Sequence, residues 1–225
     1  MVLDRLRLDD RVAIVTGGGT GLGKAMALGM ADAGAHIVLA GRRPAPIEAV
    51  AAQVASKGRR SLAIPTDVTD SAQVSAMTDR VIQEFGKIDV LINNAGGGGA
   101  GRGKNLFELT DEDWREGIDT NLTSTFYCTR AVARHMVERK MGVIINIASG
   151  NGTRGVPNNF MYSSAKAGVI GITKTMAVTL ADDNIRVHCI VPGFVAQEDP
   201  TDDEGWQRLR ERGRLNPLRR QGYAS

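Results

Sequence analysis

The sequence has little cysteine and no long hydrophobic run. Cys128 and Cys189 are the only cysteines among 225 residues, and neither has the spacing to other ligands that a metal site requires. Isolated cysteines of this kind are typical of buried thiols in a reducing compartment. No run is apolar enough to cross a bilayer, and the charged stretch 1–11 lacks the apolar region of a secretory signal. We therefore predict a cytoplasmic protein without a metal site or a membrane anchor.

An excess of charge of one sign is also missing. The 28 basic and 25 acidic residues give a net charge of +3, which is too small to indicate a nucleic-acid partner. The arginine-rich stretch 202–220 also carries acidic residues, so we expect a solvated helix face, with a basic rim for an acidic substrate as the alternative. With 42% hydrophobic and 24% charged residues, the chain 1–225 is predicted to form a single globular domain.

Short apolar runs alternate with helical patterns along the chain. The runs span 12–16, 36–40, 62–64, 90–92, 143–147 and 186–191. Between them, a helix begins near Pro46, and another is capped by Asp70 or Ser71. A capping-box pattern at Thr110 opens a long helical stretch that reaches Arg139. This alternation predicts the α/β class, with a single-domain, Rossmann-type, doubly wound parallel sheet and helices on both faces.

A glycine-rich turn follows the first apolar run and leads into a helix. Its glycines have the spacing G-x-x-x-G-x-G, which differs from the G-x-G-x-x-G of the usual dinucleotide fingerprint. Glycines in such a turn let the backbone approach a pyrophosphate and aim the helix N-terminus at it. A plain glycine-rich turn is the alternative. The cofactor-binding candidates in this turn are Gly17, Gly19, Thr20, Gly21, Leu22 and Gly23.

Arginine stands at the end of the second run, where an acidic residue would select NAD. Arg42 and Arg43 directly follow Gly41. An acid in this place binds the ribose hydroxyls of NAD, whereas a guanidinium suits the 2′-phosphate of NADP, which it can bind through two hydrogen bonds. Thr20 is a candidate for an additional hydroxyl contact. The sequence therefore favours NADP(H) over NAD(H), with plain surface cations as the alternative.

Polar residues and glycines follow the later runs at their carboxyl ends. They are Asp67 after the third run, Asn93-Asn94-Ala95-Gly96 after the fourth, Ser149 after the fifth and Pro192-Gly193 after the sixth. In open α/β sheets, ligands bind at the edge formed by the carboxyl ends of the strands. We therefore predict that the ligand site lies at this edge.

Tyr162 and Lys166 lie four residues apart in a helical pattern, so their side chains share one face of the helix. A phenol has an ordinary pKa of about 10 and is a poor acid or base near neutrality. A cation one turn away favours the phenolate, which makes the pair a candidate for general acid–base catalysis. A solvent-facing pair on an ordinary helix is the alternative.

Taken in order, these motifs resemble the pattern of the short-chain dehydrogenase/reductase family. The matching residues are Thr16-Gly17-x-x-x-Gly21-x-Gly23, Asn93-Asn94-Ala95-Gly96, Asn121, Ser149, Tyr162-x-x-x-Lys166 and Pro192-Gly193. The similarity extends from Arg7 to Val195. It implies an oxidoreductase that interconverts a ketone and a secondary alcohol with NAD(P)(H), acts on a small molecule, and assembles as a homo-oligomer, either a dimer or a tetramer.

The resemblance also implies a role for each matching residue. Tyr162 would be the acid/base, Lys166 would favour its phenolate and hold the nicotinamide ribose, and Ser149 would hydrogen-bond the substrate oxygen. Asn121 would anchor a water between Lys166 and solvent. A helix kink and a strand-end cap are the alternative roles for Asn121 and Ser149. The other implied cofactor contacts are Asp67 and Val68 at the adenine, Asn94 at the adenine-side ribose, Val195 at the nicotinamide amide, and Ala95, Gly96, Pro192 and Gly193.

Two features depart from the family pattern. Gln197 stands where members often have threonine, and the sequence up to Ser225 lacks the further helix and final strand that members usually have. We therefore expect the sixth strand to be an open edge, with part of the substrate pocket and of the oligomer interface missing. The alternative function is a non-catalytic nucleotide-binding or assembly protein that keeps the fold. An isomerase or epimerase that uses the same Tyr/Lys pair is a weaker alternative.

The substrate pocket is expected to be lined by the segments 96–105, 150–160 and 197–215. Arg102, Lys104 and Arg154 in these segments indicate an acidic or phosphate-bearing substrate, with ordinary exposed loop cations as the alternative. Candidate substrates include 3-oxoacyl thioesters, sugar acids and cyclic ketones.

Overall fold

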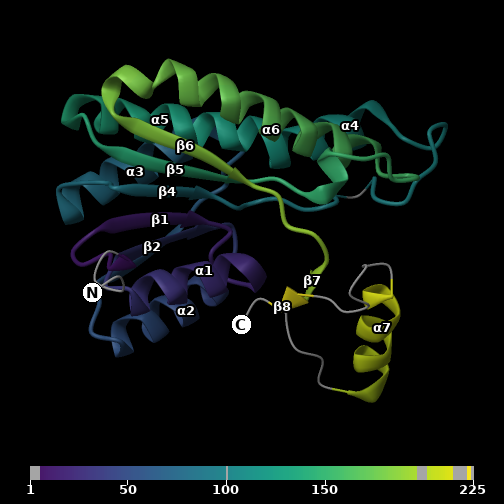
Figure 1. Ribbon diagram of the computed structural model, residues 1–225, viewed down its shortest axis with the longest axis horizontal. Coiled ribbons are helices and arrows are strands. Elements are labelled where there is room, and N and C mark those ends of the chain that lie inside the picture. Colours follow the sequence, from purple (N-terminus) through teal and green to yellow (C-terminus); the bar gives the residue numbers. More distant parts are fainter. Residues whose placement is uncertain (1–5, 100, 197–201, 215–221, 224–225) are drawn as a thin grey trace.

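Parallel strands form the centre of the computed structural model, which describes residues 6–99, 101–196, 202–214 and 222–223 (Figure 1). The strands lie in the order β3-β2-β1-β4-β5-β6, and every neighbouring pair is parallel. Their bounds are Val12–Thr16 for β1, His36–Gly41 for β2, Ser61–Pro65 for β3, Val90–Asn93 for β4, Gly142–Ile147 for β5 and Ile185–Ile190 for β6. All six strands expected from the sequence are therefore confirmed. The strand order reverses between β1 and β4, and ligands of open α/β sheets bind at such a point.

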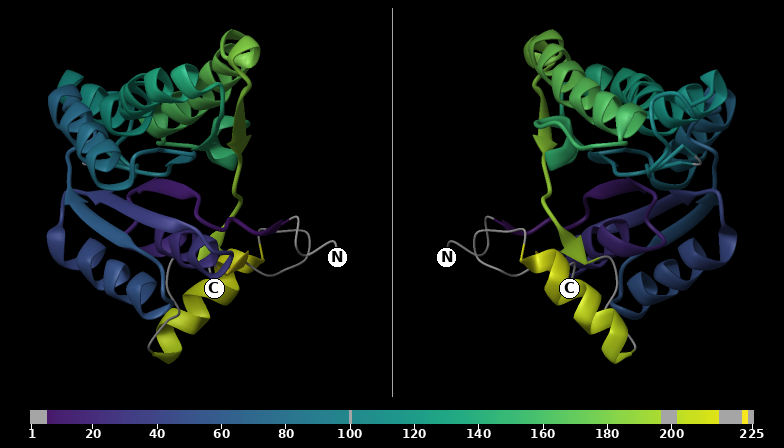
Figure 2. Two further views of the ribbon diagram at one scale, coloured as in Figure 1. Left: turned by 90° about the vertical axis from the view of Figure 1, so that its left-hand side faces the viewer. Right: turned by 90° about the vertical axis from the view of Figure 1, so that its right-hand side faces the viewer.

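Helices cover the two faces of this sheet in separate layers (Figures 1 and 2). The helices α1 (Gly21–Asp32) and α2 (Pro44–Ser56) lie on one face, and α3 (Ser71–Phe85), α5 (Ser124–Arg139) and α6 (Phe160–Thr179) lie on the other. Each face has its own hydrophobic core. On β1, Ile14 packs into the α3/α5/α6 core and the adjacent Val15 packs into the α1/α2 core. This burial on both sides explains why the run 12–16 is apolar throughout.

The helix starts follow from capping residues. Asp70 is the N-cap of α3, because its carboxylate accepts hydrogen bonds from the backbone N–H groups of Ala72 and Gln73. Thr110 and Asp113 form the expected capping box of α4 (Asp111–Ile118). Helix α2 begins at Pro44, two residues earlier than expected from Pro46, because a proline also fits the first turn of a helix.

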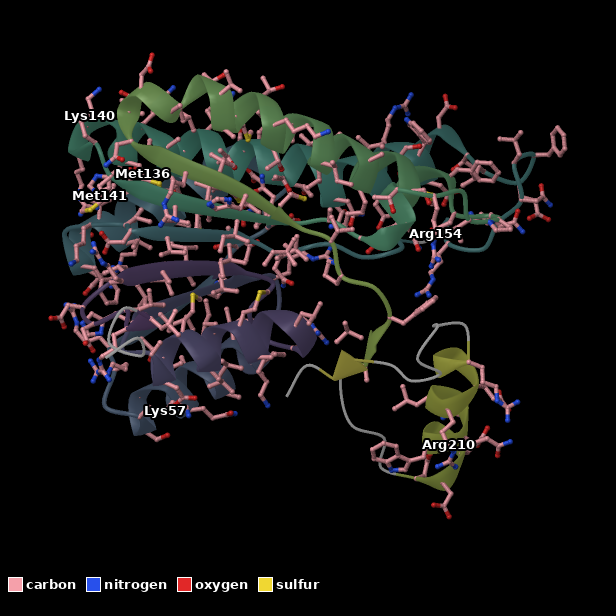
Figure 3. All side chains as sticks on the ribbon, in the orientation of Figure 1. Lys57, Met136, Lys140, Met141, Arg154 and Arg210 are labelled. Carbon is pink, nitrogen blue, oxygen red and sulfur yellow. The ribbon has the colours of Figure 1, made fainter. Side chains whose placement is uncertain are left out.

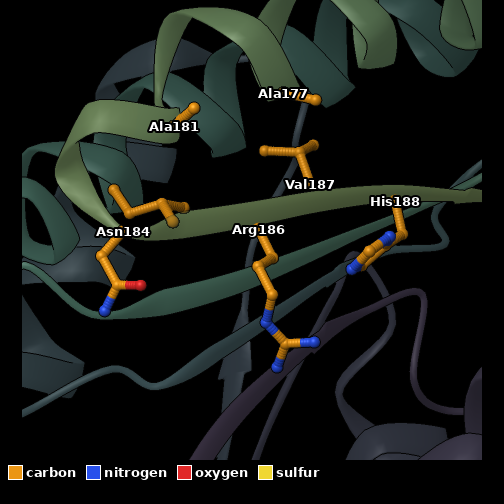
Figure 4. A pocket seen from close by; sticks show the side chains of 7 residues that line it. Ala177, Ala181, Asn184, Arg186, Val187 and His188 are labelled. Carbon is orange, nitrogen blue, oxygen red and sulfur yellow. The ribbon is translucent and has the colours of Figure 1, made fainter.

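The sixth strand is the open edge of the sheet, as the sequence predicted. Within the described part of the chain, β6 pairs only with β5. Its side chains alternate: Val187 faces Ala177 of α6, whereas Arg186 and His188 project from the opposite, uncovered face (Figure 4). The pocket drawn in Figure 4 lies at the amino end of β6, away from the edge where ligands were expected. The expectation of buried thiols holds for Cys128, but Cys189 on β6 is only half-buried.

The described residues after β6 form a small unit beside the main sheet. A two-residue strand, β7 (Val195–Ala196), pairs in parallel with β8 (Gly222–Tyr223). The helix α7 (Asp203–Gly213) stands away from the sheet in both Figures 1 and 2. Its Arg208 binds Glu204 at 2.7 Å, which agrees with a solvated helix face. No described helix has the length and apolar character needed to span a membrane.

Candidate active site

Thr16, at the end of β1, holds the glycine turn and the end of β4 together. Its hydroxyl accepts hydrogen bonds from the backbone N–H groups of Asn94 and Ala95, both at 3.0 Å, and donates to the carbonyl of Ile92 at 3.3 Å. The Asn94 amide donates to the carbonyls of Thr16 and Gly17 at 3.0 and 3.2 Å. Asn94 therefore shapes the floor of the glycine turn, and within its side chain the amide oxygen remains for the ribose contact predicted from the sequence.

The glycine turn requires glycine at particular positions. Gly17 and Gly21 have φ values of +64° and +51°, in the left-handed region that disfavours side chains. A methyl group on Gly23 would lie 2.2 Å from the carbonyl oxygen of Gly17, so helix α1 touches the turn directly. The turn therefore brings the backbone of 17–23 and the start of α1 to one place. Gly19 lies against α2, where an added methyl group would meet Pro46 at 2.8 Å.

The N-terminus of α1 has the chemistry of an anion site. Thr20 is the N-cap residue, but its side chain makes no capping hydrogen bond, and the first turn contains no acidic residue. An exposed hydroxyl and a first turn without an acidic residue of its own are suited to a phosphate group. The glycines, Thr20 and Leu22 thus lie together at the N-terminus of α1, where the predicted pyrophosphate contact would fall.

Arg42 and Arg43 lie where the sequence placed them, between β2 and α2. Both are exposed, and Arg43 is the N-cap residue of α2. Among the described residues, neither guanidinium forms an ion pair or a side-chain hydrogen bond. Both are therefore able to bind an added anion. Next to the following strand end, Val68 is buried in the core, while one oxygen of Asp67 accepts hydrogen bonds from the backbone N–H and hydroxyl of Thr69.

Asn121 lies in a π-helical turn, Asp119–Thr123, that interrupts the long helical stretch between α4 and α5. Its side-chain amide donates to the carbonyls of Gly97 and Gly117 at 2.8 and 2.9 Å, and its oxygen accepts from the N–H of Gly97 at 3.0 Å. The alternative expected from the sequence, a residue at a helix kink, describes this geometry. Through its hydrogen bonds to Gly97, Asn121 also connects the loop after β4 to the π-helical turn. Sequence spacing alone does not predict this contact.

Lys166 reaches from α6 into the interior and ends at the sheet. Only 4% of it is exposed, and its ammonium donates to the carbonyl of Ile147, the last residue of β5, at 2.8 Å. Burial lowers the pKa of Lys166 from 10.5 to about 8, while the neighbouring Cys189 thiol acts in the opposite direction. A methyl group on Gly96 would lie 3.2 Å from this ammonium and 2.5 Å from the Asn121 side-chain oxygen. Gly96 therefore permits the close approach of Lys166 and Asn121.

Tyr162 and the turn that follows Ser149 both lie near Lys166. The ammonium of Lys166 is 5.7 Å from the centre of the half-buried Tyr162 ring. Ser149 caps a short turn, Gly150–Gly152, and its hydroxyl oxygen accepts a hydrogen bond from the N–H of Asn151 at 3.2 Å. A methyl group on Gly152 would lie 2.6 Å from the carbonyl carbon of Lys166, so this turn packs directly on α6. The structure thus brings the four predicted catalytic residues, Asn121, Ser149, Tyr162 and Lys166, to one end of the sheet.

The segment after β6 lies at the same carboxyl edge of the sheet as Ser149. The N–H of Gly150 donates to the carbonyl of Pro192 at 2.9 Å, which ties the Ser149 turn to the Pro192-Gly193 corner. Gly193 is open to solvent, and Val195 lies half-buried on β7. Gln197 falls outside the described residues, as do 198–201 and 215 of the expected pocket segment.

Sequence reasoning missed a buried polar network behind the site. Asn93 on β4 donates to Thr129 and Asn146 at 2.9 and 2.8 Å, and Asn146 on β5 donates to Thr173 of α6 at 2.9 Å. Each of these side chains is at most 4% exposed. The network links two strand ends to α5 and α6. The asparagine within the apolar run 143–147 was the available signal, because an unpaired buried amide is costly.

Lys104 is not a free cation, contrary to the expectation that it could mark an acidic substrate. Its ammonium binds both carboxylate oxygens of Asp113, at 3.0 and 2.8 Å. Hydrogen bonds from Lys104 and from Thr110 lower the pKa of Asp113 to about 2. The charge of Lys104 is thus neutralised within the protein, at the capping box of α4.

Known proteins resemble this chain in sequence and in structure. Residues 11–205 match the family described as short chain dehydrogenase. A 3-oxoacyl-[acyl-carrier-protein] reductase of Synechocystis sp. is 40% identical over 192 residues, which cover 85% of this chain and 76% of that protein. A short-chain type dehydrogenase/reductase from Mycobacterium marinum superposes with a TM-score of 0.90 at 34% identity, covering 100% of this chain and 87% of that one. An NAD+-bound xylitol dehydrogenase superposes with a TM-score of 0.85 at 31% identity, covering 96% and 88%.

The extent of these matches and the geometry of the site lead to the same assignment. The family match includes the glycine turn, the end of β4, the Ser149 turn and the Tyr162–Lys166 helix. The chain therefore belongs to the short-chain dehydrogenase family.

Proposed function

We propose that this chain interconverts a ketone and a secondary alcohol, with NADP(H) as the preferred cofactor and Tyr162 as the acid/base. Members of the family are oxidoreductases that use NAD(P)(H), and they include reductases and dehydrogenases of small molecules. The observation that carries the proposal is the placement of Lys166. Its cation is buried against the end of β5, one helical turn from Tyr162 and beside the Ser149 turn.

Tyr162 and Ser149 would each act through a hydroxyl group. A bound nicotinamide would supply or accept the hydride. In carbonyl reduction, the Tyr162 hydroxyl would give its proton to the carbonyl oxygen, and the nearby Lys166 cation would stabilise the phenolate that remains. The oxygen of Ser149 accepts from Asn151, so its own O–H is left to donate to the substrate oxygen as negative charge develops there. In alcohol oxidation the same steps run backwards.

The preference for NADP(H) rests on Arg42 and Arg43. They stand at the end of β2 without an acidic partner among the described residues, and the segment offers no carboxylate to bind ribose hydroxyls. Two exposed guanidiniums favour a 2′-phosphate. The similarity to an NAD+-bound xylitol dehydrogenase makes direct comparison of the two cofactors necessary.

We also propose an assembly state and a cellular compartment for the protein. We propose a homo-oligomer, because Phe107 and Trp114 are large apolar side chains exposed to 95% and 44% in the region of α4. We propose the cytoplasm, because both cysteines are free thiols.

The direct test measures the absorbance of the reduced nicotinamide. Purified protein is mixed with NADPH or NADH and with a panel of 3-oxoacyl thioesters, keto sugar acids and cyclic ketones. We expect oxidation of NADPH with at least one class of carbonyl compound. The protein could instead bind NADPH tightly, fail to oxidise it with any of the carbonyl compounds, and fail to reduce NADP+ with the matching alcohols. That result would support the non-catalytic alternative.

A further inference from the structure

Three cations lie on the loops around the candidate site, and the structure distinguishes them. Lys104 is neutralised by Asp113. Arg102 lies back along its own loop: a methyl group on Gly98 would come within 2.5 Å of its Cδ atom, so the aliphatic part of the side chain packs on the Gly98 backbone. Arg154 differs from both, because it leaves its loop and reaches towards another segment.

Arg154 extends from the loop after β5 towards the chain between β6 and β7 (Figure 3). Its guanidinium carbon lies 5.9 Å from the centre of the Phe194 ring. Phe194 directly follows the Pro192-Gly193 corner, and the hydrogen bond from Gly150 to Pro192 joins the two segments at 2.9 Å. Arg154 therefore bridges the loop that follows Ser149 and the segment that follows the Pro192-Gly193 corner.

The guanidinium of Arg154 has no acidic partner among the described residues. It is exposed, and its aromatic contact is with the Phe194 ring, which leaves its N–H donors available. A guanidinium presents paired N–H donors that match a carboxylate or a phosphate. An exposed guanidinium without an acidic partner among the described residues, on the loop that follows Ser149, is thus suited to the anionic end of a substrate.

We propose that Arg154 is a specificity-determining residue that binds a carboxylate or phosphate group of the carbonyl substrate. This inference rests on the proposed function and deepens it, because it assigns the substrate to the class of anionic ketones or alcohols. Ser149 and Tyr162 act on the carbonyl oxygen, and Arg154 holds the charged end of the same molecule.

The experiment compares matched substrates in wild type and Arg154→Met. One keto compound is offered as a free carboxylate, as a phosphate ester and as a neutral methyl ester, with NADPH saturating. In wild type, we expect a higher kcat/KM for at least one anionic form than for the neutral ester. The preferred anion then distinguishes a carboxylate from a phosphate. In Arg154→Met, this kcat/KM should fall about 10- to 100-fold, mainly through KM, because a charge-assisted contact is lost. The neutral ester should change less than about twofold by the same reasoning.

Arg102→Met is the matched control, because it removes a neighbouring cation of the same type and should leave the preference for the anion intact. Arg154→Lys should restore part of the preference, since it keeps the charge but not the paired donors. Equal kcat/KM values for neutral and anionic forms in wild type, or equal losses for both in Arg154→Met, would overturn the inference while leaving the proposed function standing. Absence of turnover with every form would count against the proposed function itself.

Discussion

Lys166 keeps a positive charge in a place that is almost closed to water. Burial lowers its pKa to about 8, below the ordinary value of 10.5. The unfolded chain therefore holds this proton more tightly than the folded protein does. Below pH 8 the buried charge lowers the free energy of unfolding by about 3 kcal/mol. We propose that the cation is kept there because it acts on Tyr162.

The stability cost gives the first prediction, at the scale of a residue. Between about pH 8 and pH 10.5 the folded protein should gain stability relative to Lys166→Met, by up to about 3 kcal/mol, as the buried ammonium loses its proton. Urea unfolding across this pH range measures the difference. Lys174→Met, which removes an exposed lysine of the same helix, is the control. Parallel stability curves for wild type and Lys166→Met would show that the charge is not buried as described.

The second prediction concerns Arg42. Its replacement by alanine should weaken NADPH binding about 10- to 100-fold, because a charge-assisted contact to the 2′-phosphate is lost, and should change NADH binding less than about threefold. Fluorescence titration of both cofactors measures this. Arg134→Ala, an exposed arginine on α5, is the control. Equal losses for the two cofactors would reject the preference for NADP(H).

At the residue scale, the sequence predicted contacts between side chains of one helix. It missed contacts between side chains of different segments. The closeness of Tyr162 and Lys166 could be predicted because a helix fixes the relation of i to i+4. The pairing of Lys104 with Asp113 was missed because it depends on how a loop folds back onto α4. Asn146 was missed because it looks like an interruption of an apolar strand until its partners are known.

At the scale of elements, the loop after β4 is held at both of its ends. Asn121 binds Gly97, and the Lys104–Asp113 pair fixes the loop to the start of α4. Between these points, Gly101 packs on Met161, where an added methyl group would lie 2.2 Å from the Met161 side chain. Met161 immediately precedes Tyr162. The loop therefore supports the start of α6 and, through it, the position of Tyr162.

This support gives the third prediction. Lys104→Met should lower the thermal midpoint by about 3 °C at pH 7, because the buried Asp113 carboxylate loses its cation. Since the pKa of Asp113 is lowered to about 2, the contribution is fully present above about pH 4 and is lost as the pH falls towards 2. Calorimetry at several pH values measures the midpoint.

The control for the third prediction is Lys57→Met, which breaks the exposed pair with Asp32. It should shift the midpoint by less than about 1 °C, because exposed ion pairs contribute little. A midpoint for Lys104→Met that equals that of wild type at pH 7 would contradict the role of the loop.

The sequence predicted most of the arrangement of elements, because each βαβ unit contains an apolar run followed by a helical pattern. The π-helical turn at Asp119–Thr123 was not, because nothing in its sequence pattern separates it from an ordinary helix. It is defined by its backbone, where the N–H of Ser124 donates to the carbonyl of Asp119, five residues earlier.

At the scale of the whole molecule, the two faces of the sheet are covered unequally. The face with α3, α5 and α6 is covered along its length, whereas the described helices of the other face, α1 and α2, leave β6 uncovered (Figures 1 and 2). Ile190 on β6 is 47% exposed, and Ile144 on the neighbouring β5 is fully buried. The sequence predicted the open edge but not which side chains it leaves in solvent.

This asymmetry gives the fourth prediction. Ile144→Ala should cost about 2–5 kcal/mol of the free energy of unfolding, because it leaves a cavity in a packed core. Ile190→Ala should cost less than about 1 kcal/mol, since the side chain already meets water. Chemical denaturation of the two variants provides a matched comparison. A cost at Ile190 as large as that at Ile144 would show that β6 is covered in solution.

We propose that Tyr162 transfers the proton in a nicotinamide-dependent oxidoreductase. The most direct measurement is the rate of NADPH oxidation by Tyr162→Phe with a substrate that wild type reduces, together with NADPH titration of both proteins. We predict a kcat at least about 1000-fold lower and an NADPH affinity within about threefold of wild type, because the variant loses the acid but keeps the ring, Lys166 and the glycine turn. A variant that binds NADPH and keeps most of its activity would contradict the account.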